Sequence, residues 1–313
     1  MTERSPAAPL PDLQDQGYAM PEQERFNPFR WALREPMGAL GVVLIVLVVF
    51  GSFGAPILKT TNPRSLAAYS GDNLAGPSSE HFFGTDRDGK DVWSSVLYGG
   101  RISLKIGIAT VIVGTIGGTM LALIAGFLGG VVDFVFSRIA DILIAFPAIL
   151  FALTLRTALG EDLPDLPGLP RAEFVVVLAI SLIFLPAAFR IMRGTVLEQR
   201  AAQYVESATV VGASQLRIML RHILPNITGL MIVLTSISLP AAILTESTLA
   251  FLLGAGDTPS WGAELSGDSR TFFVRAPWIA IFPGAALAVT VFAFNIFGDS
   301  LRDTLDPRLR GRI

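Results

Sequence analysis

The chain has 313 residues, of which 51% are hydrophobic and 16% charged, and its mean hydropathy is +0.57. This composition excludes a disordered protein and an ordinary soluble enzyme. The net charge of −2 leaves no basic surface that could follow a nucleic-acid backbone. Cysteine is absent, which excludes disulfide frameworks, thiolate zinc sites and cysteine nucleophiles. The two histidines, His81 and His222, are too far apart in the sequence to form a metal-binding pattern.

Long apolar segments dominate the sequence. A helix needs about 20 mainly apolar residues to cross a bilayer, because the hydrocarbon core is about 30 Å thick. Six segments meet this requirement, and they are too long and too uniform to be membrane β-strands. They cover residues 39–58, 103–128, 134–155, 174–191, 227–253 and 277–297. The sequence therefore predicts an all-α integral membrane protein with six transmembrane helices.

Arginine pairs near the ends of these segments indicate how the chain is oriented. They are Arg30 and Arg34, Arg190 and Arg193, and Arg302 and Arg308. Because cytoplasmic loops carry an excess of Lys and Arg, we expect both termini to be cytoplasmic. The domain organisation that follows has a polar N-terminal tail (1–38), a membrane domain (39–299) and a C-terminal tail (300–313). An outer loop covers residues 59–102, and a long cytoplasmic loop covers residues 192–226.

The outer loop contains a stretch that is similar to a nucleotide-binding motif. Residues 84–91 fit the pattern G-x-x-x-x-G-K, but Asp91 stands where a P-loop needs Ser or Thr for Mg²⁺. Asp86 and Asp88 would repel a phosphate group. We therefore expect no nucleotide site in this loop.

The cytoplasmic loop predicts two short helices joined at Gly212. Leu216, Met219, Leu220 and Ile223 recur at helical spacing, which predicts one apolar face. Pro225 is expected to end the second helix before the fifth transmembrane segment. A short amphipathic helix on a rigid membrane scaffold is suited to dock into a groove of another protein.

The residues of this loop resemble the EAA loop of ABC importer permeases. That pattern is E-A-A, three residues, G, nine residues, I, one residue and L-P. Here it is represented by Glu206, Ser207, Ala208, Gly212, Leu224 and Pro225. Ser207 replaces the first Ala, and His222 stands at the Ile position.

Two further stretches are similar to the peptide/nickel branch of these permeases. Residues 83–92 and 100–104 resemble its G-T-D-x-x-G-R-D-V and G-x-R-x-S-L signatures, with Lys90 in place of Arg and Ser95 where Arg is common. Residues 294–309 resemble the end of the second permease subunit, of the DppC/OppC type. The resemblance extends from Met37 to Arg310.

The resemblance implies a type I importer permease fold in a bacterial or archaeal plasma membrane. It implies a heterodimer with a homologous second permease, two cytoplasmic ATPase subunits on the EAA loops and an extracytoplasmic solute-binding protein. ATP and Mg²⁺ would be bound by the ATPase subunits, and this chain would have no cofactor and no catalytic residue. Substrate identity stays open among dipeptides, oligopeptides, glutathione-like solutes and nickel chelates.

Two polar residues within the apolar segments are further candidates. Glu246 lies in the fifth segment, where an ionisable side chain is costly. It either lines a transport path or hydrogen-bonds to Ser or Thr for packing, and we favour packing. Asn295 in the sixth segment predicts a hydrogen bond between helices. Gly114 and Gly118 form a G-x-x-x-G pattern, which predicts close helix packing.

Two other functions are alternatives to an importer permease. A secondary transporter would work without an ATPase and would show repeats and more titratable groups near the bilayer centre. A membrane-embedded enzyme would need paired acids, a histidine motif or metal-ligand spacing, none of which the sequence shows. The long cytoplasmic loop and the few charges within the apolar segments favour the importer permease.

Overall fold

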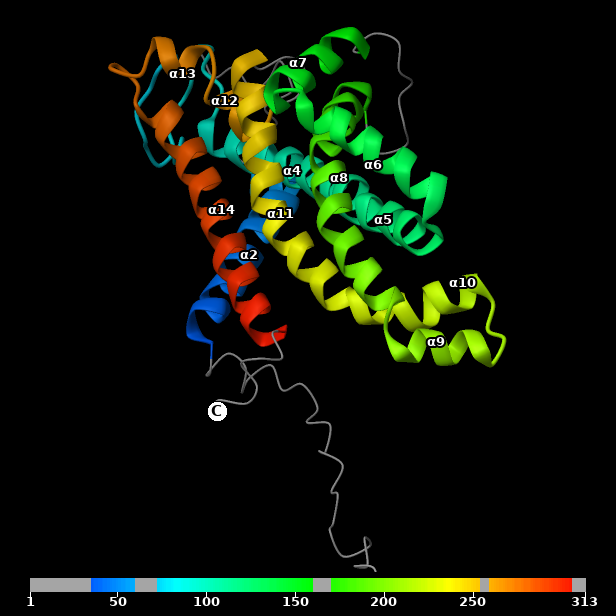
Figure 1. Cartoon of the computed structure of the whole chain (residues 1–313). Helices are drawn as coiled ribbons and strands as arrows, with labels where there is room; N and C mark the ends of the chain where they lie inside the picture. Colours follow the sequence, from blue (N-terminus) through cyan, green and yellow to red (C-terminus); the bar gives the residue numbers. More distant parts are fainter. Residues whose placement is uncertain (1–34, 60–71, 160–169, 254–258, 306–313) are drawn as a thin grey trace, which may run out of the picture.

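The computed structural model describes residues 35–59, 72–159, 170–253 and 259–305. Within these ranges the protein is helical, and an isolated bridge between Thr85 and Asp91 is the one β contact. The long helices form one bundle (Figure 1). The helices are α2 (Pro36–Phe53), α3 (Ala55–Leu58), α4 (Val92–Val111), η2 (Ile112–Ile116), α5 (Gly117–Leu128), α6 (Gly130–Ala145), α7 (Ala148–Leu159), α8 (Arg171–Arg200), α9 (Gln203–Val210), α10 (Gln215–Ile218), η3 (Met219–Ile223), α11 (Leu224–Leu253), α12 (Trp261–Glu264), α13 (Asp268–Thr271) and α14 (Trp278–Leu305).

Five helical stretches of the described chain are long and apolar enough to cross a bilayer. They are Pro36–Phe53, Val92–Leu128, Arg171–Arg200, Gln215–Leu253 and Trp278–Thr304. The third predicted segment, 134–155, is instead divided into α6 and α7, which meet at an angle of 96°. Counting this bent pair as one span gives six.

The break between α6 and α7 has a local cause. Phe146, at the end of α6, is extended with φ −82° and ψ 138°, and Pro147 follows it. A residue before proline is disfavoured in the helical region, and proline cannot donate a helical hydrogen bond. Pro186, Pro240 and Pro283 lie inside α8, α11 and α14, which run on through them. Proline therefore interrupts one of these spans and leaves three continuous.

Helices run beyond several of the predicted boundaries. The span that contains α4 begins at Val92, inside the predicted outer loop, and α8 continues to Arg200, inside the predicted cytoplasmic loop. The last helix extends to Leu305, beyond residue 299. The polar ends of these helices extend beyond the apolar residues that cross the hydrocarbon core. Helix lengths predicted from the apolar segments alone are therefore too short.

Glycines allow the second span to pack closely on α8. A Cβ atom at Gly118 would lie 2.5 Å from the carbonyl oxygen of Leu185, and one at Gly114 would lie 3.0 Å from that of Ser181. The G-x-x-x-G prediction is therefore confirmed as a packing feature. Gly107 fits against Ile243 of α11 in the same way.

The two ends of the bundle carry different structures. Figure 1 shows α9 and α10 projecting at one end, where the first residues of α2 and the last residues of α14 also lie. We call it the α9 end. Figure 1 places α12 and α13 at the other end, which we call the α12 end.

A short helix is inserted between the spans at the α12 end. Trp261 begins α12 and is 2% exposed, and its indole nitrogen donates a hydrogen bond of 2.9 Å to the carbonyl oxygen of Val96. Gly99, Gly100 and Gly262 leave room for this insertion, since a Cβ atom at Gly262 would lie 2.1 Å from the Ser247 carbonyl oxygen. This contact fixes α4 relative to α11.

Candidate functional site

Gly212 joins α9 to α10, as the sequence predicted. Its φ of +85° is in the left-handed region, where glycine carries no steric penalty. The Gly212 N–H donates to the Thr209 carbonyl oxygen at 2.9 Å, and the Ala213 N–H donates to the Ala208 carbonyl oxygen at 3.0 Å. This pair of bonds is the Schellman arrangement that ends helices. It fixes the angle at which the chain leaves α9.

The helix after Gly212 is not a short one. Ser214 caps its first turn by accepting a hydrogen bond from the Arg217 N–H, and the helical stretch then runs from Gln215 to Leu253. The prediction that Pro225 ends a helix is wrong. Pro225 is the second residue of α11 and follows the π-helical turn η3. Because a π turn is wider than an α turn, we attribute the continuity to η3, which eases the clash between the proline ring and the preceding carbonyls.

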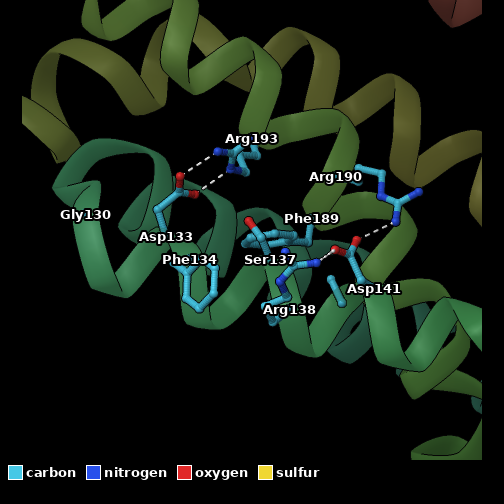
Figure 2. A pocket seen from close by; sticks show the side chains of 10 residues that line it. Gly130, Asp133, Phe134, Ser137, Arg138, Asp141, Phe189, Arg190 and Arg193 are labelled. Carbon is cyan, nitrogen blue, oxygen red and sulfur yellow. Dashed lines mark hydrogen bonds and ion pairs between the residues drawn. The ribbon is translucent and has the colours of Figure 1, made fainter.

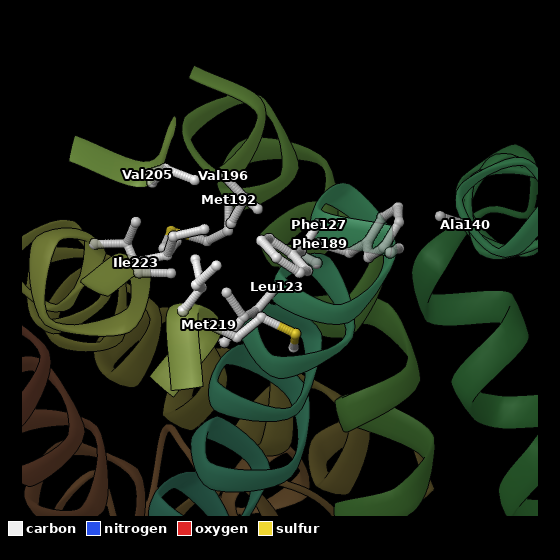
Figure 3. Close-up of a cluster of buried hydrophobic side chains, with 13 residues drawn as sticks. Leu123, Phe127, Ala140, Phe189, Met192, Val196, Val205, Met219 and Ile223 are labelled. Carbon is white, nitrogen blue, oxygen red and sulfur yellow. The ribbon is translucent and has the colours of Figure 1, made fainter. Parts of the chain in front are cut away.

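A buried apolar cluster ties this region to the spans. Figure 3 shows labelled side chains of α5, α6, α8, α9 and η3 in this cluster, which also includes Ile227 of α11. Val205 of α9 is 5% exposed, and Ile223 of η3 is fully buried. Their partners include Leu123, Phe127, Phe189, Met192, Val196, Ile218, Met219 and Ile227. A displacement of α9 would therefore be transmitted to α5 and α8 through packed side chains.

The outer surface of the same region is apolar and uncovered in this chain. Val210 and Val211 are 83% and 87% exposed, and Leu216 and Leu220 are also exposed. The prediction of one apolar face is wrong, because Met219 and Ile223 turn into the cluster while Leu216 and Leu220 turn outward. The π turn that starts at Met219 changes the angle per residue, which separates the two pairs. Sequence reasoning missed Val210 and Val211, although two adjacent valines beside a turn glycine were a visible signal.

The structure brings the predicted coupling residues into one region. Glu206 and Ser207 are exposed on α9, and Ala208 packs against the buried cluster. Leu224 also packs against that cluster, and Pro225 is exposed. The N-cap residue of α9 is Ala202, and the helix start has no side-chain cap, so Glu206 does not cap its own helix. Its carboxylate is free to meet another molecule.

Glu246 lies within a buried polar group at the α12 end of α11. The residue is 2% exposed, and its carboxylate accepts a hydrogen bond of 3.2 Å from the Ser247 hydroxyl. The hydroxyls of Ser103 and Ser260 face the same carboxylate, and Arg156 of α7 lies close enough to interact with it electrostatically. The group therefore joins α4, α7, α11 and the segment before α12.

The other predicted polar residue and an unpredicted ion pair are two further polar features of the spans. Asn295 is exposed on α14 and has no hydrogen-bond partner among the described residues. Lys105 of α4 and Glu173 of α8 form an ion pair of 2.5 Å, with Glu173 4% exposed. Their separation of 68 residues prevents such a pairing from being read from the sequence.

The loop at the α12 end is closed to a phosphate group. The N–H groups of Asp88 and Lys90 both donate to the Asp86 carboxylate, at 2.9 and 2.8 Å. Burial raises the pKa of Asp86, and these hydrogen bonds oppose that effect. Asp91 caps α4 by accepting from the Ser94 N–H at 2.9 Å. The backbone donors that a P-loop would offer to an anion are thus occupied by the loop's own carboxylates.

The comparisons with known proteins agree with this architecture. Residues 118–311 match the family profile described as "Binding-protein-dependent transport system inner membrane component". The chain belongs to this family. It is therefore a multi-pass protein of the bacterial inner membrane and a permease component of a binding-protein-dependent transport system.

Curated relatives match the chain over nearly its whole length. The glutathione transport system permease protein GsiD of Pectobacterium atrosepticum is 37% identical, over 97% of this chain and 96% of that protein. The dipeptide transport system permease protein DppC of Alkalihalophilus pseudofirmus is 36% identical, over 98% and 96%. GsiD of Escherichia coli is 37% identical, over 93% and 92%.

Proposed function

We propose that this chain is one of two permease subunits of an ATP-driven importer for peptides or glutathione-like solutes. The relatives are named for dipeptide and glutathione transport, which supports a small peptide as the substrate class. The second permease subunit, two ATPase subunits and an extracytoplasmic binding protein would complete the assembly. ATP and Mg²⁺ would be bound by the ATPases, and this chain would contribute a wall of the path.

The observation that carries this proposal is the surface of α9 and α10. Four exposed apolar side chains and the exposed Glu206 lie on the projecting stretch from α9 to η3, and this stretch is fixed to the spans by the buried cluster around Val205 and Ile223. An exposed apolar patch with a charged rim is typical of a protein-docking surface. A surface that is firmly anchored to α5, α8 and α11 can convert closure of the ATPases into movement of the spans.

The test is Glu206→Lys in the assembled importer. We expect loss of substrate uptake and of ATPase co-purification with unchanged membrane insertion, because the carboxylate of Glu206 faces outward. Glu198→Lys is the matched control, since Glu198 is an exposed glutamate of α8 that precedes α9. Normal uptake and co-purification in Glu206→Lys would refute coupling through this surface.

A secondary transporter is the alternative function. It would move substrate without ATPase subunits and would purify as this chain alone. A mild-detergent pull-down of the tagged chain from its host distinguishes the two: the importer proposal requires a second permease and ATPase subunits among the co-purified proteins.

For Glu246 we propose a packing role. Its carboxylate is enclosed by hydroxyl groups from three segments, so it would hold α4 and the start of α12 against α11. Glu246→Gln, which keeps the shape and a hydrogen-bond acceptor, should retain transport and change mainly the thermal stability. A complete loss of uptake in a stable Glu246→Gln protein would assign this residue to the path.

A further inference from the structure

A cavity of about 400 Å³ lies between α6 and α8, and none of its lining residues belongs to α9 or to the Glu246 group. Figure 2 shows its charged lining, which comes from one side of α6 and the facing side of α8. The charged and polar residues are Asp133, Ser137, Arg138, Asp141, Arg190 and Arg193. Its volume is in the range of small-ligand sites.

The cavity lies near the α9 end of the membrane domain. A Cβ atom at Gly129, the residue before α6, would lie 2.9 Å from the guanidinium of Arg200, the last residue of α8. Arg138 is eight residues along α6 from Gly130, which corresponds to roughly 12 Å at 1.5 Å per residue. A long arginine side chain at this depth reaches the headgroup region of the adjacent leaflet.

The lining has a surplus of positive charge. The Arg193 guanidinium donates hydrogen bonds to both carboxylate oxygens of Asp133. The Asp141 carboxylate forms ion pairs with two guanidinium groups, with Arg190 Nη2 at 2.7 Å and Arg138 Nη1 at 3.5 Å. Because each guanidinium carries five N–H donors, most donors of Arg138 and Arg190 remain available to an anion.

A buried hydroxyl adds to this arrangement. The Ser137 Oγ atom is removed from solvent and has no hydrogen-bond partner in the described part of the chain. Buried polar atoms in proteins are nearly always paired, so an unpaired one beside a cavity calls for a missing partner. Ser137 is one of the lining residues, so rotation of its side chain toward the cavity would let a ligand oxygen supply this partner.

The surface around Arg138 is apolar and exposed. On α6, Phe134 and Ile142 are each 60% exposed, and Val135 and Ile139 are exposed as well. The guanidinium of Arg138 lies over the Phe134 ring, 5.3 Å from its centroid. This apolar surface would contribute nothing to the binding of an isolated phosphate ion, whereas the acyl chains of a lipid would pack against it.

We propose that this cavity binds the phosphate headgroup of an anionic phospholipid, whose acyl chains lie along the exposed apolar face of α6. Arg138 and Arg190 bind the phosphate, and Ser137 donates a hydrogen bond to it. Basic pockets between transmembrane helices at this level favour anionic lipids. The bound lipid would strengthen the contact between α6 and α8, because Ala140 is the one buried residue of α6. This inference does not depend on the importer proposal.

The test uses the full chain, which has no native cysteine. A fluorophore on Ile142→Cys reports lipid at α6, and one on Val46→Cys reports lipid at α2, where Val46 is 57% exposed. Quenching by brominated phosphatidylglycerol is compared with quenching by brominated phosphatidylcholine in reconstituted membranes. We expect an approximately fivefold preference for phosphatidylglycerol at Ile142→Cys, the value for one arginine near an anionic headgroup, and no preference at Val46→Cys.

Substitutions of residues that line the cavity test whether it binds the lipid headgroup. Arg138→Gln should remove the preference, and it should fold because Arg138 is 64% exposed on the surface of α6. Arg302→Gln, an exposed arginine at the α9 end of α14, should keep it. A weaker variant, Ser137→Ala, should reduce the preference without removing a charge.

Three results would overturn the proposal. The first is an equal lipid preference in Arg138→Gln and the unchanged protein. The second is loss of the preference with added inorganic phosphate at lipid-equivalent concentration, which would assign the cavity to a free anion. The third is loss of the preference when the second permease subunit is co-reconstituted, which would show that a protein surface covers the cavity.

Discussion

At the residue scale, the backbone conformation at Gly212 favours glycine, although the space around it would admit a larger side chain. A Cβ atom there would meet no neighbour within 4 Å, but φ is +85°. Alanine in a left-handed conformation costs about 1–2 kcal/mol, and proline, whose φ is near −65°, does not fit. Asparagine tolerates this conformation best among the other residues.

The prediction for Gly212 is a graded series. Gly212→Asn should keep most substrate uptake, Gly212→Ala should reduce it, and Gly212→Pro should abolish it while the protein still inserts into the membrane. Uptake assays with a measured membrane content of each variant provide the check. Equal uptake in the asparagine and proline variants would show that the left-handed turn is irrelevant to coupling.

The raised pKa of Glu264 in α12 predicts a pH-dependent stability. Burial raises the pKa of Glu264 to about 7, with a further increase from Asp86 and an opposing effect from Lys90. Because the folded-state pKa is higher than the unfolded value of about 4.5, the folded state binds the proton more tightly. The free energy of unfolding therefore decreases as pH rises from about 4.5 to 7, by on the order of 1–3 kcal/mol from this group.

Glu264→Gln should remove this part of the pH dependence. The thermal midpoint of the unchanged protein should decrease between pH 5 and pH 8 by more than that of Glu264→Gln in the same detergent. The variant should also be the more stable of the two at pH 8, since it has no buried charge. Parallel pH profiles for the two proteins would contradict the assignment.

At the scale of elements, the contact between the second span and α8 depends on individual glycines. Gly118 and Gly117 are adjacent on α5, yet only Gly118 faces α8: its Cβ atom would lie 2.5 Å from a backbone oxygen, whereas Gly117 has nothing within 4 Å. Gly118→Ala should destabilise the protein by about 1–3 kcal/mol through overpacking. Gly117→Ala should be neutral or stabilising by up to about 1 kcal/mol.

Thermal unfolding of the two alanine variants in detergent is the measurement. The pair is internally controlled, because both substitutions add one methyl group to the same helical turn. A similar melting temperature for the two variants would contradict the prediction, because it would mean that α5 and α8 accommodate an added methyl group at Gly118 without loss of stability.

The elements also show what sequence reasoning could predict. Long apolar segments locate the spans, and Gly212 locates the turn after α9, because both signals are local. The break at Phe146–Pro147 was not distinguishable from Pro186, Pro240 or Pro283, since the packing of neighbouring helices decides which proline is tolerated. The π turn before Pro225 was missed for the same reason.

The candidate site could be predicted only in part. Glu206 to Pro225 lie in one stretch of sequence, so a spacing pattern finds them. The cavity between α6 and α8 joins residues about 60 positions apart, such as Asp133 and Arg193, and no local pattern connects them. The insertion of Trp261 between α4 and α11 likewise depends on three glycines in two separate segments, Gly99 and Gly100 of α4 and Gly262 of α12.

At the scale of the whole molecule, the position of α9 predicts the orientation in the membrane. The first residues of α2, the last residues of α14 and α9 itself lie at the same end of the bundle (Figure 1). If this end is cytoplasmic, as docking to an ATPase requires, both ends of the membrane domain are cytoplasmic too. The arginines Arg190 and Arg193 near this end agree with the positive-inside rule.

Single cysteines test this orientation, and the cysteine-free chain makes the experiment clean. Ser214→Cys lies exposed at the start of α10, and Glu80→Cys lies exposed in the loop at the α12 end. In intact cells, a membrane-impermeant thiol reagent should label Glu80→Cys and leave Ser214→Cys unlabelled. After permeabilisation both should react, which shows that the exposed thiol of Ser214→Cys was protected by the membrane and not by the fold. Labelling of Ser214→Cys in intact cells would place α9 outside, where no ATPase can dock, and would overturn the orientation and the coupling role together.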